Sequence, residues 1–275
     1  MKQHTRLLML LPLAVLLAAT ACKKEPVSEP PGGDSPQQQL PNPLPAHALV
    51  RQQRWTETDH QTFAYNDKGQ VMQEIFQYQY VQGDPTKIRT MIYDFTYDSQ
   101  NRPVQLNYTG GFTTQFLYHG NLIHKTRELY PGGALAKEVT YLYSNNRMAQ
   151  ETWRIPSIPG EPDDVYKHVF GYDNRGNLNK VEVFEQTGVD QFKLLETTTY
   201  SDFDDKINPL SWQLRYPYIP QLRLQFNNPR KVSVQAEDGT VSTTTYAYEY
   251  NAQGLPVSNQ ETRPNGGVLN STYQY

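Results

Sequence analysis

The chain has 275 residues, with 25 basic and 28 acidic side chains and a formal net charge of −3. No basic patch stands out, so the composition argues against nucleic acid as a partner. Cys22 is the only cysteine, whereas tyrosine occurs 20 times. Any interpretation of the sequence must therefore account for a lone thiol and a surplus of aromatic side chains.

The first 22 residues have the organisation of an export signal. Lys2 and Arg6 precede an apolar run of 13 residues, 7–19, and Thr20-Ala21-Cys22 follows. A helix needs about 20 apolar residues to span a bilayer, so this run is too short. The segment resembles a bacterial lipoprotein signal peptide, with residues 19–22 as its lipobox and Ala19 where leucine is commonest.

That resemblance implies that residues 1–21 are removed and that the Cys22 sulfur carries a diacylglycerol. The alternative is a free thiol after an ordinary signal peptide, which would be a liability outside the cell. We therefore expect a membrane partner through the lipid anchor alone, without a spanning segment. The resemblance implies the outer membrane as the location.

The composition changes sharply near residue 49. Residues 22–48 contain the lipid-bearing cysteine, seven prolines and no aromatic side chain, which predicts a disordered, partly polyproline linker. Residues 49–275 hold every tyrosine and all three tryptophans. We expect them to form one all-β domain.

An aromatic-x-aromatic pair followed by a turn recurs through this domain. Copies lie at residues 63–69, 95–101, 116–120, 141–146, 170–176 and 248–254, with a degenerate copy at 203–206. Aromatics at i and i+2 share one face of a strand, and Asn or Asp followed by Gly favours a tight turn. The repeat predicts successive β-hairpins, 14 to 18 strands in all, forming an antiparallel meander in a strongly twisted or curled sheet.

These hairpins resemble the YD repeats of RHS-type proteins. Tyr97-Asp98 and Tyr172-Asp173 keep the Tyr-Asp pair, and Asn101-Arg102 and Asn146-Arg147 keep the arginine after an Asn in the glycine position. The combination of lipobox, linker and hairpins is also similar to surface lipoproteins of Bacteroidota that contain domains of unknown function. Both resemblances imply an architecture and say almost nothing about activity.

The sequence shows no catalytic apparatus, and we expect neither enzyme activity nor a cofactor or metal. His119 and His124 flank a turn without a third metal ligand. Asp202, Asp204 and Asp205 are close enough in sequence to hold Ca²⁺, but they lack a calcium-loop glycine and adjoin Lys206. A solvated turn is the preferred interpretation.

The aromatic surplus has two explanations, a half-buried core or a platform for sugar rings. Trp212, Tyr216 and Tyr218 lie between prolines and are the candidate ligand contacts. We expect a non-catalytic binding or scaffold lipoprotein of unknown ligand. The alternatives are a glycan-binding accessory protein of a polysaccharide-uptake system, an envelope-protein partner, and a hydrolase with a carboxylate pair in a cleft.

Overall fold

The computed structural model describes residues 46–81, 83–145, 147–210 and 225–275, which form sixteen strands and one short 3-10 helix, η1 (Ala46–Ala48). The strands are β1 (Gln52–Arg54), β2 (His60–Tyr65), β3 (Val71–Gln79), β4 (Ile88–Tyr97), β5 (Pro103–Tyr108), β6 (Phe112–His119), β7 (Leu122–Leu129), β8 (Leu135–Ser144), β9 (Arg147–Ile155), β10 (Asp164–Tyr172), β11 (Leu178–Gly188), β12 (Gln191–Ser201), β13 (Lys231–Ala236), β14 (Val241–Tyr250), β15 (Pro256–Thr262) and β16 (Val268–Gln274).

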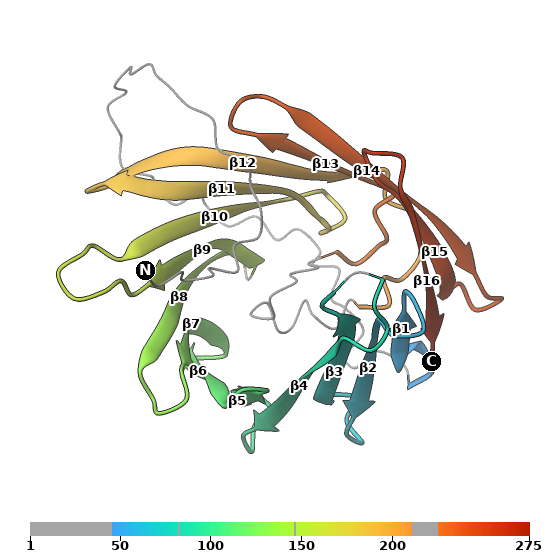
Figure 1. Ribbon diagram of the computed structural model, residues 1–275, viewed down its shortest axis with the longest axis horizontal. Coiled ribbons are helices and arrows are strands. Elements are labelled where there is room, and N and C mark those ends of the chain that lie inside the picture. Colours follow the sequence, from blue (N-terminus) through green and yellow to red (C-terminus); the bar gives the residue numbers. More distant parts are fainter. Residues whose placement is uncertain (1–45, 82, 146, 211–224) are drawn as a thin grey trace.

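All sixteen strands belong to one closed antiparallel barrel (Figure 1). Each strand pairs with its neighbours in the chain, and β1 closes the ring by pairing Gln53 with Tyr273 of β16. The all-β class and the meander order agree with the repeat, but the expected open, twisted or curled sheet is wrong. The closing strand has three residues and no aromatic repeat, so nothing in its sequence indicates the pairing that removes both sheet edges.

Four hairpin turns share one hydrogen-bonded geometry, which explains the Asn or Asp that follows their aromatic pairs. In the first, Oδ1 of Asn66 accepts the backbone N–H groups of Lys68 and Gln70, both at 3.0 Å. The equivalent acceptors are Asp98, Asp173 and Asn251. Three residues after the acceptor the chain takes a positive φ, 89° at Gly176, where a Cβ would come within 3.0 Å of two neighbouring side chains.

The second aromatic of the repeats is a tyrosine whose hydroxyl joins one hairpin to the preceding one. Tyr65 donates to the carbonyl oxygen of Val50 at 2.7 Å, just before β1. The same contact occurs in the pairs Tyr97–Val71, Tyr118–Pro103, Tyr143–Ile123 and Tyr172–Met148. Tyr248, the first aromatic of its copy, and Tyr275 bond in the same way to the carbonyl oxygens of Pro229 and Pro256. These tyrosines are therefore structural, with the ring in the barrel and the hydroxyl on a backbone carbonyl.

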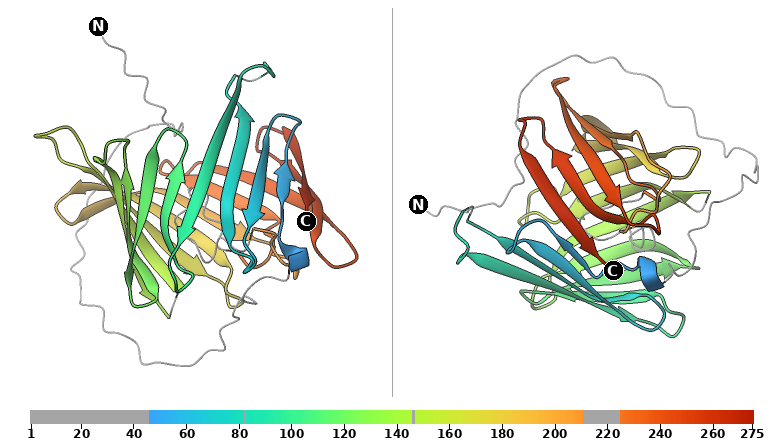
Figure 2. Two further views of the ribbon diagram at one scale, coloured as in Figure 1. Left: turned by 90° about the horizontal axis from the view of Figure 1, so that it is seen from below. Right: turned by 90° about the vertical axis from the view of Figure 1, so that its right-hand side faces the viewer.

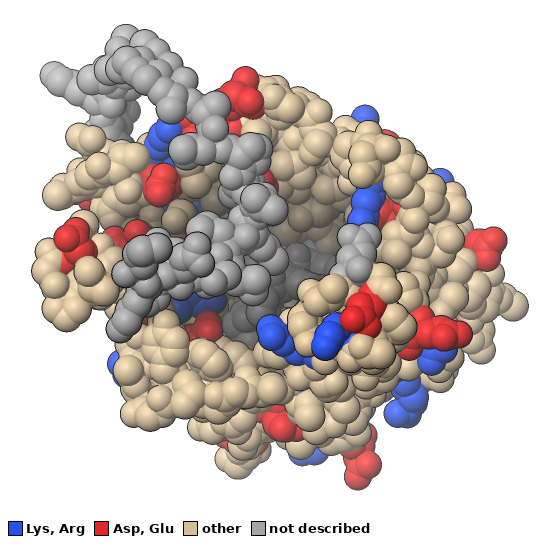
Figure 3. Space-filling view, viewed as in Figure 1, with Lys and Arg blue, Asp and Glu red and all other residues tan. Residues whose placement is uncertain are grey.

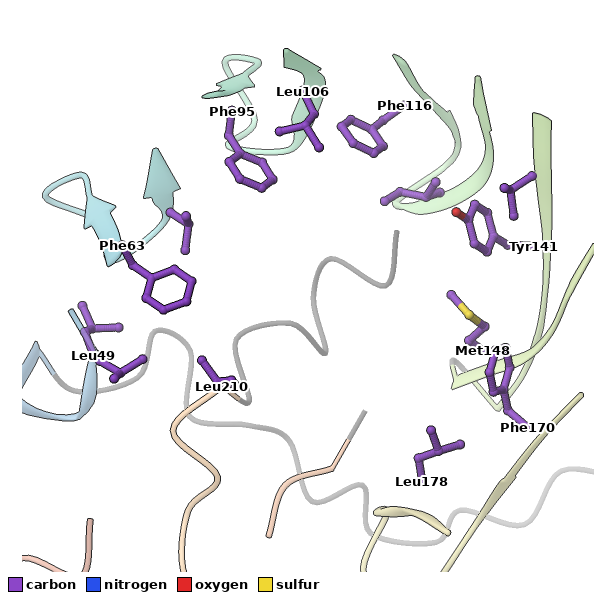
Figure 4. Close-up of a cluster of buried hydrophobic side chains, with 14 of the residues drawn as sticks. Leu49, Phe63, Phe95, Leu106, Phe116, Tyr141, Met148, Phe170, Leu178 and Leu210 are labelled. Atoms are coloured by element: carbon purple, nitrogen blue, oxygen red, sulfur yellow. The ribbon is translucent and has the colours of Figure 1, made fainter. Parts of the chain in front are cut away.

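Apolar side chains occupy the lumen face of the barrel. The first aromatics of five repeats point inward and are at most 8% exposed: Phe63, Phe95, Phe116, Tyr141 and Phe170 (Figure 4). Leu210, from the connection between β12 and β13, reaches the same cluster and is 1% exposed. The core thus lies inside the barrel, near the hairpin turns that carry the repeat.

The outer face of the barrel, defined as the strand positions that alternate with this lumen face, carries many polar side chains together with exposed apolar ones such as Ile92, Leu117 and Leu142. Side chains pair across it at hydrogen-bonding distance, as in Gln73–Asp94 at 2.7 Å, Lys125–Glu138 at 2.8 Å and Ser258–Glu249 at 2.8 Å. Lys and Arg are interspersed with Asp and Glu around the rim (Figure 3), and the side views show the strands tilted across the barrel (Figure 2). Alternation along each strand therefore places the aromatic core and some buried polar side chains, such as Glu74, on the lumen face, and the charged pairs on the exterior.

Replacing Tyr65 with Phe should lower the free energy of unfolding by about 1–2 kcal/mol, because the ring stays buried while the Val50 carbonyl loses its donor. Urea unfolding of the purified barrel measures the change. Tyr130→Phe is the control, since Tyr130 is 50% exposed, and it should leave the unfolding midpoint unchanged. Equal midpoints for the two variants would show that the hydroxyl contact does not stabilise the barrel.

Candidate ligand-binding site

A cavity of about 330 Å³ lies inside the barrel, against the strands next to the closing seam. Strands β1 and β12–β16 contribute Gln53, Tyr200, Val232, Tyr246, Tyr248, Asn259, Glu261 and Tyr273. Trp55 follows β1, and the connection between β12 and β13 adds Asn208, Pro209, Gln225, Asn228 and Pro229. The lining therefore consists mainly of aromatic rings and uncharged amides, with two prolines, one valine, and Glu261 as its one charged side chain among the described residues.

Two amide side chains in this lining have polar atoms without a hydrogen-bond partner in the described part of the chain. They are Oε1 of Gln53, an acceptor, and Nε2 of Gln225, a donor. The two residues are 1% and 2% exposed. A buried polar atom left unpaired costs about 1–3 kcal/mol, so a polar group entering the cavity would recover part of that free energy.

Tyrosine rings form a row along β14. The ring centroids of Tyr246 and Tyr248 are 6.4 Å apart with planes inclined by 25°, and Tyr250 continues the row at 6.2 Å. Trp55 is held edge-on against Phe76, with centroids 6.0 Å apart. The strand period places these rings on one face, because residues 246, 248 and 250 alternate with exposed positions.

Asp204 fixes the connection that completes the cavity. Its Oδ1 accepts the backbone N–H groups of Lys206 at 3.0 Å and Asn228 at 3.1 Å, and its Oδ2 accepts the hydroxyl of Tyr250. Asp204 is 9% exposed, so the solvated-turn interpretation is wrong for this residue, although the Asp205 side chain is 81% exposed. The sequence does not distinguish a solvated turn aspartate from a buried one here, because Asn228, the hydrogen-bond partner of Asp204, is 24 residues away.

A second polar group is buried on the lumen face of β8–β10, away from the cavity. Nδ1 of His168 lies 3.3 Å from Oε1 of Glu151, and the His168 ring lies 4.7 Å from that of Trp153. Burial raises the pKa of Glu151 to about 7, against the opposing effects of Trp153 and the Lys137 ammonium. Burial, and then the charge of Lys137, lower the pKa of His168 to about 4. None of the four lines the cavity, so their contacts serve to join three neighbouring strands.

Glu74 of β3 is buried with one neutral partner, Gln61, whose Nε2 donates to its Oε1 at 2.6 Å. Burial raises the pKa of Glu74 from about 4.5 to about 7, and the bond from Gln61 lowers it only in part. Glu74 and Glu151 lie on β3 and β9, six strands apart around the barrel. These two buried carboxylates therefore do not form the carboxylate pair that the hydrolase hypothesis requires.

The residues predicted from sequence and the residues of the cavity are different sets. Cys22, Trp212, Tyr216 and Tyr218 lie outside the described residues. His119 and His124 are exposed on β6 and β7, and the described ranges contain no cluster of three metal-ligating side chains. Gln53 and Gln225 carried no sequence signal, because isolated glutamines occur throughout the chain.

Comparison with known proteins identifies the architecture. No protein-family profile matches the chain. No curated protein matches it either. The barrel is shared with two solved bacterial structures. A porin-like protein from Bacteroides uniformis aligns with a TM-score of 0.54 and 12% identity, over 82% of this chain and 97% of that one. A porin-like protein from Bacteroides vulgatus aligns with a TM-score of 0.55 and 12% identity, over 82% and 98%.

This likeness establishes a common barrel fold. At 12% identity it does not extend to function. Within the described ranges, the chain has no helix with the length and apolarity needed to cross a bilayer. The properties of the barrel surface and cavity must therefore be taken from this chain's own residues.

Glu74→Gln should stabilise the barrel at alkaline pH. Because the folded-state pKa is raised, Glu74 destabilises the fold increasingly as pH rises from about 4.5 to about 7. The variant should gain on the order of 3 kcal/mol in unfolding free energy at pH 8 and almost nothing at pH 4. Urea titrations at both values measure this.

His168 has the opposite pH dependence, because its pKa is lowered. Its contribution to the free energy of unfolding is present above about pH 6.5 and is lost as the pH falls to about 4. His168 is the same in variant and wild type, so its contribution cancels in the comparison. The control is Glu57→Gln at an exposed site, for which no change is expected. A gain in unfolding free energy for Glu74→Gln that is equal at pH 4 and pH 8 would contradict a raised pKa of Glu74.

Proposed function

We propose that this chain is a cell-envelope lipoprotein, anchored through Cys22 in the outer membrane, whose barrel stays outside the bilayer in a non-catalytic binding role. The observation that carries the proposal is the set of charged side chains on the outer face. Barrels that span membranes have an apolar band about 25 Å tall on the outside and a polar lumen. Here the lumen holds the aromatic core, and the outer face pairs Lys125 and Arg127 with Glu138.

The energetic cost of placing charged side chains in lipid supports a barrel outside the bilayer. A Lys or Arg on the lipid face of a barrel costs about 2–4 kcal/mol at the bilayer midplane. Lys125, Lys167 and Lys180 occupy outer-face positions on β7, β10 and β11, where Lys167 covers the rings of Phe184 and Phe192 at 4.6 and 4.2 Å. Such a surface favours contact with water, so the attachment to the membrane is assigned to the lipid on Cys22.

The cavity supports binding rather than catalysis. Among the described lining residues the single carboxylate is that of Glu261, which accepts a bond from Nε of Arg263 at 2.7 Å. The other polar groups are amides and tyrosine hydroxyls, which do not exchange protons readily near neutral pH. Lining of this kind can hold a polar molecule by hydrogen bonds, but it offers no acid–base pair.

Cys22→Ser should move the protein from the membrane fraction to the soluble fraction while the barrel stays folded. The measurement is fractionation of cells that express the variant, with cooperative urea unfolding as the test of folding. Ser28→Ala, in the same linker, is the matched control and should remain with the membrane. A folded Cys22→Ser protein that resists extraction would indicate a lipid-inserted barrel and would overturn the proposal.

A further inference from the structure

We infer that the cavity binds a neutral, hydroxyl-rich ligand, a mono- or disaccharide unit, and this inference rests on the proposed binding role. Oε1 of Gln53 requires a donor and Nε2 of Gln225 requires an acceptor. A hydroxyl group supplies both functions, and a sugar presents several hydroxyls in a fixed arrangement. The cavity lining therefore contains a donor and an acceptor without partners in the described part of the chain, and a polyol carries the complementary groups for both.

The charge of the lining selects against ionic ligands. No Lys or Arg occurs among the described lining residues, so a phosphate or an acidic sugar would meet Glu261 without a compensating cation. A cationic ligand would have to compete with Arg263 for that carboxylate. Burying an unpaired charge costs far more than burying a hydrogen-bonded hydroxyl, so a neutral ligand is favoured.

The aromatic side chains of the lining fit the apolar faces of a sugar ring. Sugars carry apolar C–H groups between their hydroxyls, and Tyr246, Tyr248 and Trp55 present apolar rings to the cavity. The volume of about 330 Å³ lies at the lower end of the roughly 300–1,000 Å³ typical of small-molecule sites, which suits one or two sugar rings. The cavity thus contains both amide groups that can bond to sugar hydroxyls and aromatic rings that can pack against sugar C–H groups.

The test is direct binding to the full-length protein. The probes are maltose, cellobiose, mannobiose and N-acetylglucosamine as neutral sugars, with glucuronate and inorganic phosphate as anionic comparators. Isothermal titration gives the Kd, and quenching of the tryptophan fluorescence, to which Trp55 contributes, reports binding. We expect at least one neutral sugar to bind and the anions not to bind.

Gln225→Met and Gln53→Met keep the side-chain length and remove the hydrogen-bonding groups. Each should raise the Kd of the bound sugar about tenfold, which corresponds to the loss of one hydrogen bond. Gln260→Met is the matched control, because Gln260 lies on β15 between Asn259 and Glu261 but on the outer face, and it should leave the Kd unchanged. Unfolding curves establish that all three variants are folded.

Three outcomes would overturn the inference. They are binding of no neutral sugar, tighter binding of glucuronate or phosphate than of any neutral sugar, and binding that neither glutamine substitution weakens. A cavity that holds only water gives the first outcome. The membrane fractionation of Cys22→Ser is independent of these results, so a failed sugar test with a released Cys22→Ser protein rejects the ligand class and leaves the anchoring intact.

Discussion

The pairing of β1 with β16 is the contact on which the rest of the structure depends. Gln53 and Tyr273 face each other across this seam, and both line the cavity. Without the seam, the sheet would expose two edges with unpaired backbone groups. The three residues of β1 thus complete the barrel and one side of the candidate site together.

Tyrosine hydroxyls supply the second constraint. Each bond from a repeat tyrosine to an earlier backbone carbonyl, such as Tyr172 to Met148 at 2.8 Å, sets the offset between successive hairpins. Offsets of this kind accumulate around a sheet, and their sum determines whether the last strand meets the first. The aromatic surplus is thereby largely explained by architecture.

The two faces of the barrel carry different side chains. They alternate along each strand, and the aromatic core occupies the lumen face. Phe95 points into the lumen while Asp94 and Thr96 point outwards. The fold shared with the porin-like proteins therefore leaves the environment of the outer face to be determined by sequence.

The local rules of this protein were readable from its sequence. The Asn or Asp after four of the aromatic pairs, the positive-φ residue such as Gly176, and the alternation of the strands follow from turn and strand chemistry within about ten residues. Closure, the burial of Asp204 by Asn228, and the convergence of Gln53 with Gln225 join residues that are 24 to 220 positions apart. Such contacts are fixed by the summed twist and stagger of sixteen strands, which no local pattern encodes, and so the tertiary structure alone decided them.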